Sequence, residues 1–108
     1  MPSFTVLSGS AVKGILDRDP ALVLDLIRDA YLLHENGETI NPDSYFLRFP
    51  ERPEARIIAL PAYVGGSYDV AGIKWISSFP KNVESGLPRA SAVLILNEPY
   101  SQPSSSAP

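Results

Sequence analysis

The sequence predicts an α+β domain, in which an N-terminal helix packs on a mixed or antiparallel sheet of four or more strands. Two observations favour this class. Apolar residues recur at helical spacing between Asp19 and Gly37, and beyond Gly37 the chain changes to short β-branched and aromatic runs punctuated by proline and glycine. Helix and strands therefore occupy separate parts of the chain, as is typical of α+β folds.

The first residues predict a short strand and a brief helix. Phe4 to Leu7 is partly β-branched and favours a strand. Ser8 or Ser10 can then cap a helix, because a serine hydroxyl accepts a hydrogen bond from a free first-turn amide. The apolar residues of that helix are Ala11, Val12, Ile15 and Leu16.

A longer helix is predicted to begin at Asp19-Pro20. The aspartate can accept the free first-turn amides, and proline suits the first helical position. One apolar face follows, and Asn36-Gly37 supplies a left-handed stop. The residues of that face are Val23, Leu26, Ile27, Ala30 and Leu33.

The remaining chain predicts four strands. They are Tyr45 to Phe49, Arg56 to Leu60, Val70 to Ser77 and Ser91 to Asn97. The last is apolar at consecutive positions from Ala92 to Leu96, which predicts cover on both of its faces. The Ser/Pro-rich residues 99–108 predict a disordered tail, so residues 1–98 form one domain that needs more covering structure than the chain supplies.

Composition excludes several classes of function. The net charge is −3 with scattered basic residues, which argues against nucleic acid and anionic membranes as partners. No apolar stretch reaches a membrane span of about 20 residues, and the first residues lack a signal-peptide layout, so a cytoplasmic location is expected. With no cysteine and one histidine, a metal site is not expected.

Lys74 is the leading candidate for a functional residue. It is a lone cation in the apolar run Val70 to Ile76, where an unpaired ammonium is costly and usually finds a carboxylate. The alternative is an edge-strand lysine that reaches solvent and discourages aggregation. Spacing alone leaves both interpretations open.

Arg48 is the second candidate. It lies among aromatic residues, and its planar guanidinium suits two-point binding of a carboxylate, although stacking on an aromatic ring is the alternative. Arg48 and Lys74 could converge on one carboxylate if they share a face of the sheet. Arg56 and Arg89 open strands, where arginines are commonly solvated, and rank lower.

Two other features have simpler structural explanations. His34 lies at the end of the longer helix, where a positive charge favours the helix dipole. Gly65-Gly66 is expected in a turn between strands and lacks the strand-turn-helix context of a phosphate loop. Nucleotide binding is therefore not predicted for this chain alone.

Several runs stand in a distinctive order along the chain. They are Arg56 to Tyr63, Gly72 to Ile76, Pro80 to Asn82, Gly86 to Ser91 and Val93 to Glu98. In order and spacing they resemble the ornithine cyclodeaminase/mu-crystallin family over most of residues 4–99. Within that family, three runs are most similar to the N-(2-amino-2-carboxyethyl)-L-glutamate dehydrogenases of 2,3-diaminopropionate biosynthesis, which serve siderophore and antibiotic pathways. They are the segment from Tyr45 to Arg48, the run that begins at Arg56 and the Gly-Ile-Lys-Trp run.

The resemblance implies an NAD-dependent oxidoreductase acting on an amino acid, with NAD as the parent family's cofactor. Arg48 then corresponds to an arginine that grips the substrate carboxylate, and Lys74 to a catalytic lysine that contacts the same carboxylate and transfers a proton. Two alternatives remain: a fragment of an ornithine cyclodeaminase, which forms proline and ammonia, and a non-catalytic dimerisation or ligand-binding remnant.

The chain also departs from the family pattern. A Ser-x-x-Arg-Thr helix and a Gly-x-Gly-x-x-Gly Rossmann domain, which follow the last strand in the family, are missing from these 108 residues. The resemblance therefore implies an incomplete substrate-binding and dimerisation domain that binds no NAD and is inactive alone. A homodimer through the sheet is expected from the same comparison.

Overall fold

The structure, a computed structural model, describes residues 4–98, so the tail predicted for residues 99–108 lies outside the described residues. It confirms the α+β class. In chain order the elements are α1 (Gly9–Arg18), α2 (Pro20–Glu35), β1 (Thr39–Ile40), β2 (Tyr45–Phe49), β3 (Arg52–Val64), β4 (Val70–Ser78), the 3-10 helix η1 (Pro80–Ser85) and β5 (Ala90–Asn97).

The chain begins differently from the prediction. Helix α1 starts after Ser8, whose hydroxyl oxygen accepts a hydrogen bond from the Ala11 amide at 3.1 Å, as predicted. The strand predicted from Phe4 to Leu7 is wrong, because this segment has no regular secondary structure. No strand of the described sheet pairs with this segment, so its backbone amides and carbonyls form no hydrogen bonds to a neighbouring strand.

Helix α2 follows its local sequence signals closely. The Asp19 carboxylate accepts a hydrogen bond from the Leu22 amide at 3.1 Å, and Pro20 takes the first helical position. Gly37, just beyond the C-terminal end, has a φ of 76°, a left-handed conformation that glycine adopts without steric cost. Both ends of this helix are thus confirmed.

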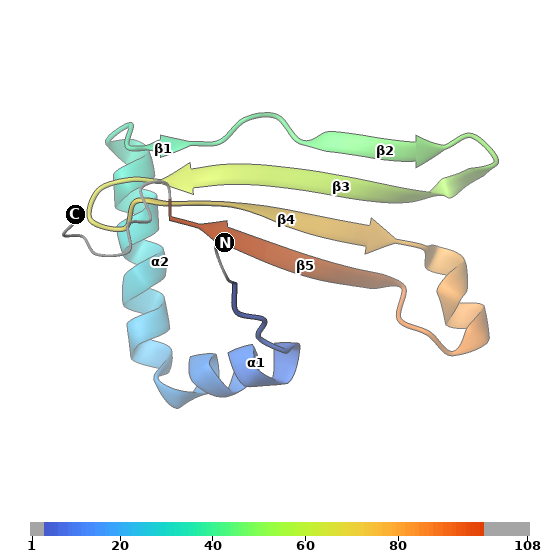
Figure 1. The fold of residues 1–108 in the computed structure, drawn as a ribbon, viewed down its shortest axis with the longest axis horizontal. Helices are drawn as coiled ribbons and strands as arrows, with labels where there is room; N and C mark the ends of the chain where they lie inside the picture. The colour runs from blue at the N-terminus through green and yellow to red at the C-terminus, as the bar shows by residue number, and fades with distance from the viewer. Residues whose placement is uncertain (1–3, 99–108) are drawn as a thin grey trace.

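The five strands form one antiparallel sheet in which β3 and β4 are central (Figure 1). One edge of β3 pairs with β4, and the other pairs with β1 and β2 at different points. Strand β3 is longer than predicted because it continues through Pro61, which lies opposite the gap between β1 and β2. A residue without an amide hydrogen is tolerated on that edge of β3, since neither β1 nor β2 lies opposite Pro61, although Ile73 of β4 pairs with it on the other edge.

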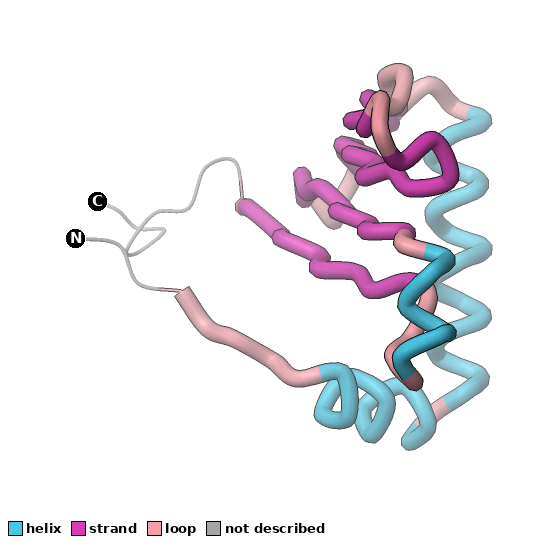
Figure 2. Tube along the Cα trace, turned by 90° about the vertical axis from the view of Figure 1, so that its right-hand side faces the viewer, coloured by secondary structure: helices cyan, strands magenta, loops and turns pink. Residues whose placement is uncertain are grey.

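Helix α2 crosses the sheet near the ends of β1 and β3 (Figure 1) and lies to one side of it (Figure 2). Helix α1 lies below the β5 edge (Figure 1). Most of the sheet is therefore left without a covering layer in the described part of the chain. No helix in residues 4–98 has the length and apolar character needed to cross a membrane.

Little of the described chain is enclosed. Ala55 is its single buried apolar residue, and all eight residues of β5 are exposed. Leu94 and Leu96 are 62% and 65% exposed on one face of β5, and Val93 and Ile95 are 58% and 51% exposed on the other. The two-sided cover predicted for Ala92 to Leu96 is thus not supplied within residues 4–98.

Candidate functional site

The strand register places Arg48, Arg56 and Lys74 on one face of the sheet. Arg48 pairs directly with Arg56, and Lys74 pairs with Leu60, four residues further along β3. Residues directly opposite each other on neighbouring strands share a face, and residues two or four apart along a strand do so as well. The condition set by the sequence, that Arg48 and Lys74 share a face, is therefore met.

We call this surface the cationic face. Its members at the paired positions of β2 to β5 are Phe46, Arg48, Arg56, Ile58, Leu60, Ala62, Val64, Val70, Gly72, Lys74, Ile76, Ser78, Ala90, Ala92, Leu94 and Leu96. Three of these residues carry a positive charge, and none carries a negative charge.

The opposite surface, which we call the apolar face, has no charged residue along the regularly paired part of the sheet, which begins at Arg56 on β3. Its members are Tyr45, Leu47, Ile57, Ala59, Pro61, Tyr63, Ala71, Ile73, Trp75, Ser77, Ser91, Val93, Ile95 and Asn97. From Arg56 onward along β3, the three charges of the paired positions thus lie on one side of the sheet; Arg52, which pairs with Phe49, and Glu54 lie on β3 before that point.

Lys74 projects from an interior strand. Its neighbours across the sheet are Leu60 on β3 and Leu94 on β5, so the edge-strand explanation for this lysine does not apply. The Lys74 side chain is exposed, and no ion pair engages it within residues 4–98. An ammonium surrounded by leucines in the middle of a sheet is a natural contact for an external anion.

Arg48 leans along the cationic face. Its guanidinium carbon lies 5.2 Å from the centre of the Phe46 ring, a cation–π contact. Phe46 pairs with Ile58, which stands between Arg56 and Leu60 on β3, so the guanidinium is drawn towards the row that holds Lys74. The stacking alternative is thus observed, and it directs Arg48 along the same surface.

Arg56 does not open a strand, although the sequence predicted that it would. It lies within β3, where it is half-buried and flanked by Arg48 and Ser78. Its Nε atom is fully buried and has no hydrogen-bond partner. In the sequence, Arg56 is a cation beside an apolar run, as Lys74 is. Because the predicted strand began at Arg56, its side chain was expected to be solvated.

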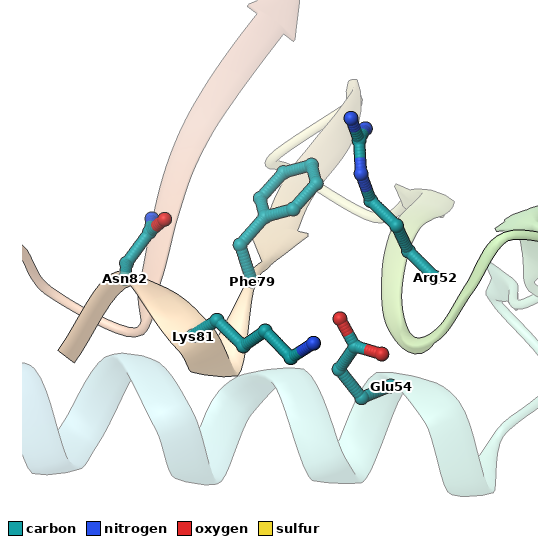
Figure 3. Close-up of a pocket in the computed structure, with 5 residues that line it drawn as sticks. All are labelled: Arg52, Glu54, Phe79, Lys81 and Asn82. Carbon is teal, nitrogen blue, oxygen red and sulfur yellow. The ribbon is translucent and has the colours of Figure 1, made fainter. Parts of the chain in front are cut away.

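A surface hollow of about 270 Å³ adjoins the Arg56 end of the cationic face. It is lined by Arg52, Glu54, Phe79, Lys81 and Asn82. Glu54 lies two residues before Arg56, and Phe79 directly follows Ser78, the residue that pairs with Arg56. The Lys81 side chain points towards Glu54 (Figure 3). The hollow is thus separate from Lys74.

Other titratable groups lie away from the cationic face. His34 is in the last turn of α2, and its Nδ1 lies 2.6 Å from the Thr39 hydroxyl. The Tyr68 hydroxyl donates a 2.7 Å hydrogen bond to Asp29, and this bond raises the pKa of Tyr68 above its ordinary value of 10.0, helped by desolvation and by the charge of Asp29. Arg89 is exposed just before β5.

The described residues do not fit a nucleotide or a metal ion. Gly65 and Gly66 form the turn between the antiparallel strands β3 and β4, whereas a dinucleotide loop joins a strand to the N-terminus of a helix. Residues 4–98 also hold no group of three histidine or carboxylate side chains placed to bind a metal.

Comparison with known proteins gives concordant matches. Residues 6–103 match the sequence profile of the Ornithine cyclodeaminase/mu-crystallin family. The N-((2S)-2-amino-2-carboxyethyl)-L-glutamate dehydrogenase of Staphylococcus aureus is 38% identical over 80 residues, which cover 70% of this chain and 24% of that protein.

Two solved structures share the fold. An archaeal alanine dehydrogenase dimer with bound NAD gives a TM-score of 0.60 at 32% identity, covering 69% of this chain and 22% of that one. The Δ1-pyrroline-2-carboxylate reductase of Thermococcus litoralis, in complex with NADH and L-proline, gives 0.64 at 26% identity, covering 71% and 23%. The chain spans about a quarter of the length of the curated relatives it matches, between 24% and 29%.

Proposed function

Because the chain belongs to the ornithine cyclodeaminase/mu-crystallin family, we propose that it is the substrate-binding part of an NAD-dependent oxidoreductase that acts on an amino acid. The cationic face carries this proposal, because it gathers Arg48, Arg56 and Lys74 without a compensating carboxylate at its paired positions. The structural relatives hold NAD or NADH, one of them together with L-proline. A cytoplasmic location, where NAD is abundant, follows from the same proposal.

Arg48 and Lys74 have distinct roles in this proposal. The Arg48 guanidinium offers paired donors to the substrate carboxylate, and its contact with Phe46 limits its rotation. The Lys74 side chain binds the same carboxylate. As a neutral amine it accepts the proton that the substrate nitrogen loses when hydride leaves the adjoining carbon, and as an ammonium it returns that proton in the reverse direction. When bound, NAD supplies the hydride acceptor, and its site lies in residues other than those described here.

We further propose that the substrate belongs to 2,3-diaminopropionate biosynthesis. The Staphylococcus aureus relative is named as a dehydrogenase of a glutamate derivative, and it is 38% identical over the matched residues. The name of this enzyme describes a substrate that has the carboxylates of glutamate and one further carboxylate on the aminoethyl group. A surface with three cations suits such an acid better than it suits ornithine, whose side chain ends in an amine.

The Lys74 role is tested by kinetics in a protein that contains this chain joined to a nucleotide-binding domain. Lys74→Ala is expected to lower kcat/KM for the amino acid by about 100-fold or more, the usual contribution of a general acid or base. Lys74→Arg keeps the charge and is expected to retain KM while losing kcat. Full activity in Lys74→Ala would refute the assignment, and Arg89→Ala serves as the exposed control.

We also propose that two copies of the chain associate through the apolar face. From Arg56 onward along β3, this face has no charge at its paired positions, and Trp75, Val93 and Ile95 on it are 42%, 58% and 51% exposed. Apolar area of this kind is commonly covered by a partner. A second copy is the favoured occupant, because the archaeal alanine dehydrogenase with the same fold is a dimer.

Sedimentation velocity tests the dimer with a matched pair of variants. Val93→Lys places a charge on the apolar face and is expected to yield monomers. Leu94→Lys adds the same charge to the neighbouring residue on the cationic face and should leave the dimer intact. A wild-type chain that remains monomeric at high concentration would reject the proposal.

A further inference from the structure

The Arg48–Arg56 pair is the least expected feature of the sheet. The two arginines lie directly opposite each other on β2 and β3, where side chains start about 5 Å apart. Like charges at such positions repel, and no carboxylate shares the paired positions of the cationic face to offset them. An external anion at this point would relieve the repulsion.

Arg56 differs from Arg48 in its surroundings. Arg48 is exposed and stacks on Phe46, whereas Arg56 is half-buried and its Nε is buried without a hydrogen-bond partner. The Nε is enclosed, so a ligand would meet Arg56 at the terminal nitrogens of its guanidinium, for which a carboxylate is the strongest partner. Glu54 lies two residues away but forms no ion pair with Arg56 in the described part of the chain.

The spacing along β3 separates Arg56 from the Lys74 row. Lys74 is opposite Leu60, and four residues of an extended strand correspond to about 13 Å. Two long side chains reaching towards each other leave room between them for a small ligand. Arg48 is level with Arg56, so the same spacing separates its backbone from the Lys74 row, and only its guanidinium leans back over Phe46. A carboxylate held between that guanidinium and Lys74 would place a second negative group of the same ligand near Arg56.

We propose that Arg56 is a specificity residue that binds a second carboxylate of the substrate, so that the site selects amino acids carrying two or more carboxylates. The inference rests on the proposed function, in which Arg48 and Lys74 hold the first carboxylate. It assigns to Arg56 the distinction between an acidic side chain and a neutral or basic one.

L-Glutamate and L-glutamine provide a matched pair of probes, since they differ chiefly in a carboxylate replaced by an amide. Each is titrated into the ¹⁵N-labelled chain, and affinities are taken from amide shifts near residues 48, 56 and 74. Wild type is expected to bind glutamate about tenfold or more tightly than glutamine, the effect of one charge-assisted hydrogen-bonded contact.

Arg56→Gln is expected to lower the affinity for glutamate to that for glutamine and to leave glutamine binding unchanged. Arg52→Gln is the control, because Arg52 lies on the same strand but lines the separate hollow; it should keep the preference for glutamate. Arg56→Lys retains the charge and should keep part of the preference, and a preserved amide spectrum shows that each variant is folded.

The outcomes separate the two proposals. Equal wild-type affinity for the two amino acids, or an undiminished preference in Arg56→Gln, would overturn the role of Arg56 while leaving the carboxylate site of Arg48 and Lys74 in place. Failure of both amino acids to bind would overturn the proposed function itself. The wild-type ratio decides the question even where a variant does not fold.

Discussion

Arg48 on β2 and Arg56 on β3 are cross-strand partners, so two guanidinium groups leave neighbouring positions on the same face of the sheet. Such a pair opposes folding in the absence of a ligand, because like charges directly opposite each other repel. The same arrangement is useful once a carboxylate is bound. Stability and binding are therefore expected to respond in opposite directions to changes at this pair.

Removing one charge of the pair should change how stability responds to salt. Salt screens the repulsion in the wild type, so its free energy of unfolding should rise by about 0.2–1 kcal/mol more than that of Arg48→Gln between low and high ionic strength. Urea unfolding at two sodium chloride concentrations measures this difference. Arg89 is exposed just before β5, so the stability of Arg89→Gln should respond to salt as the wild type does. If the stability of Arg48→Gln also responded to salt as the wild type does, the repulsion between Arg48 and Arg56 would be contradicted.

Asp19→Ala should destabilise α2 by about 1 kcal/mol, because the carboxylate that accepts the Leu22 amide is lost. Circular dichroism at 222 nm during urea unfolding gives the measurement. Asp17→Ala is the comparison, since Asp17 forms an exposed ion pair with Lys13, a class of interaction worth about 0.3–0.5 kcal/mol. Equal effects of the two substitutions would argue against the cap.

Gly72→Ala should weaken the pairing of β4 with β5. A Cβ atom at this position would lie 2.6 Å from the Ile95 carbonyl oxygen, so the strands must move apart at a cost of about 1–3 kcal/mol. Faster amide exchange in β5 would report the change. Gly14→Ala meets no atom within 4 Å and should instead stabilise α1 by up to about 1 kcal/mol.

The hydroxyl of Tyr68 should ionise at a higher pH than an ordinary tyrosine. Its hydrogen bond to Asp29 favours the protonated phenol, so the pKa is raised from 10.0. The stabilisation from this group is therefore fully present below pH 10 and is lost as the pH rises through the folded-state pKa. A ¹³C-tyrosine titration by NMR should show Tyr68 shifting towards the ordinary pKa in Asp29→Asn; no change in that variant would exclude Asp29 as the cause.

Local sequence signals predicted the helices well because each signal acts within one turn. Ser8, Asp19 and Gly37 all occupy the positions that their side chains or backbone freedom favour. The strand predicted from Phe4 to Leu7 failed for the opposite reason. A strand needs a partner, and the β-propensity of a segment does not reveal whether one is available.

Residue types made Arg48 and Lys74 candidate site residues, but whether the two share a face depends on the strand register. The pairing of β2 with β3 shifts between Arg48 and Phe49, so counting residues along the chain does not give the face of each side chain. Arg56 was predicted to open its strand, whereas β3 begins four residues earlier, at Arg52. Its partnership with Arg48 is visible only once the register is known.

Alternation along β4 places Lys74 and Trp75, neighbours in sequence, on opposite sides of the sheet. Inserting one residue upstream within this strand would exchange the two sides, carrying the ammonium to the proposed subunit contact and the indole to the ligand. Two consecutive insertions would restore the arrangement. We therefore expect natural length variation in this part of β4 to occur in even numbers of residues, or in the turns beyond its ends.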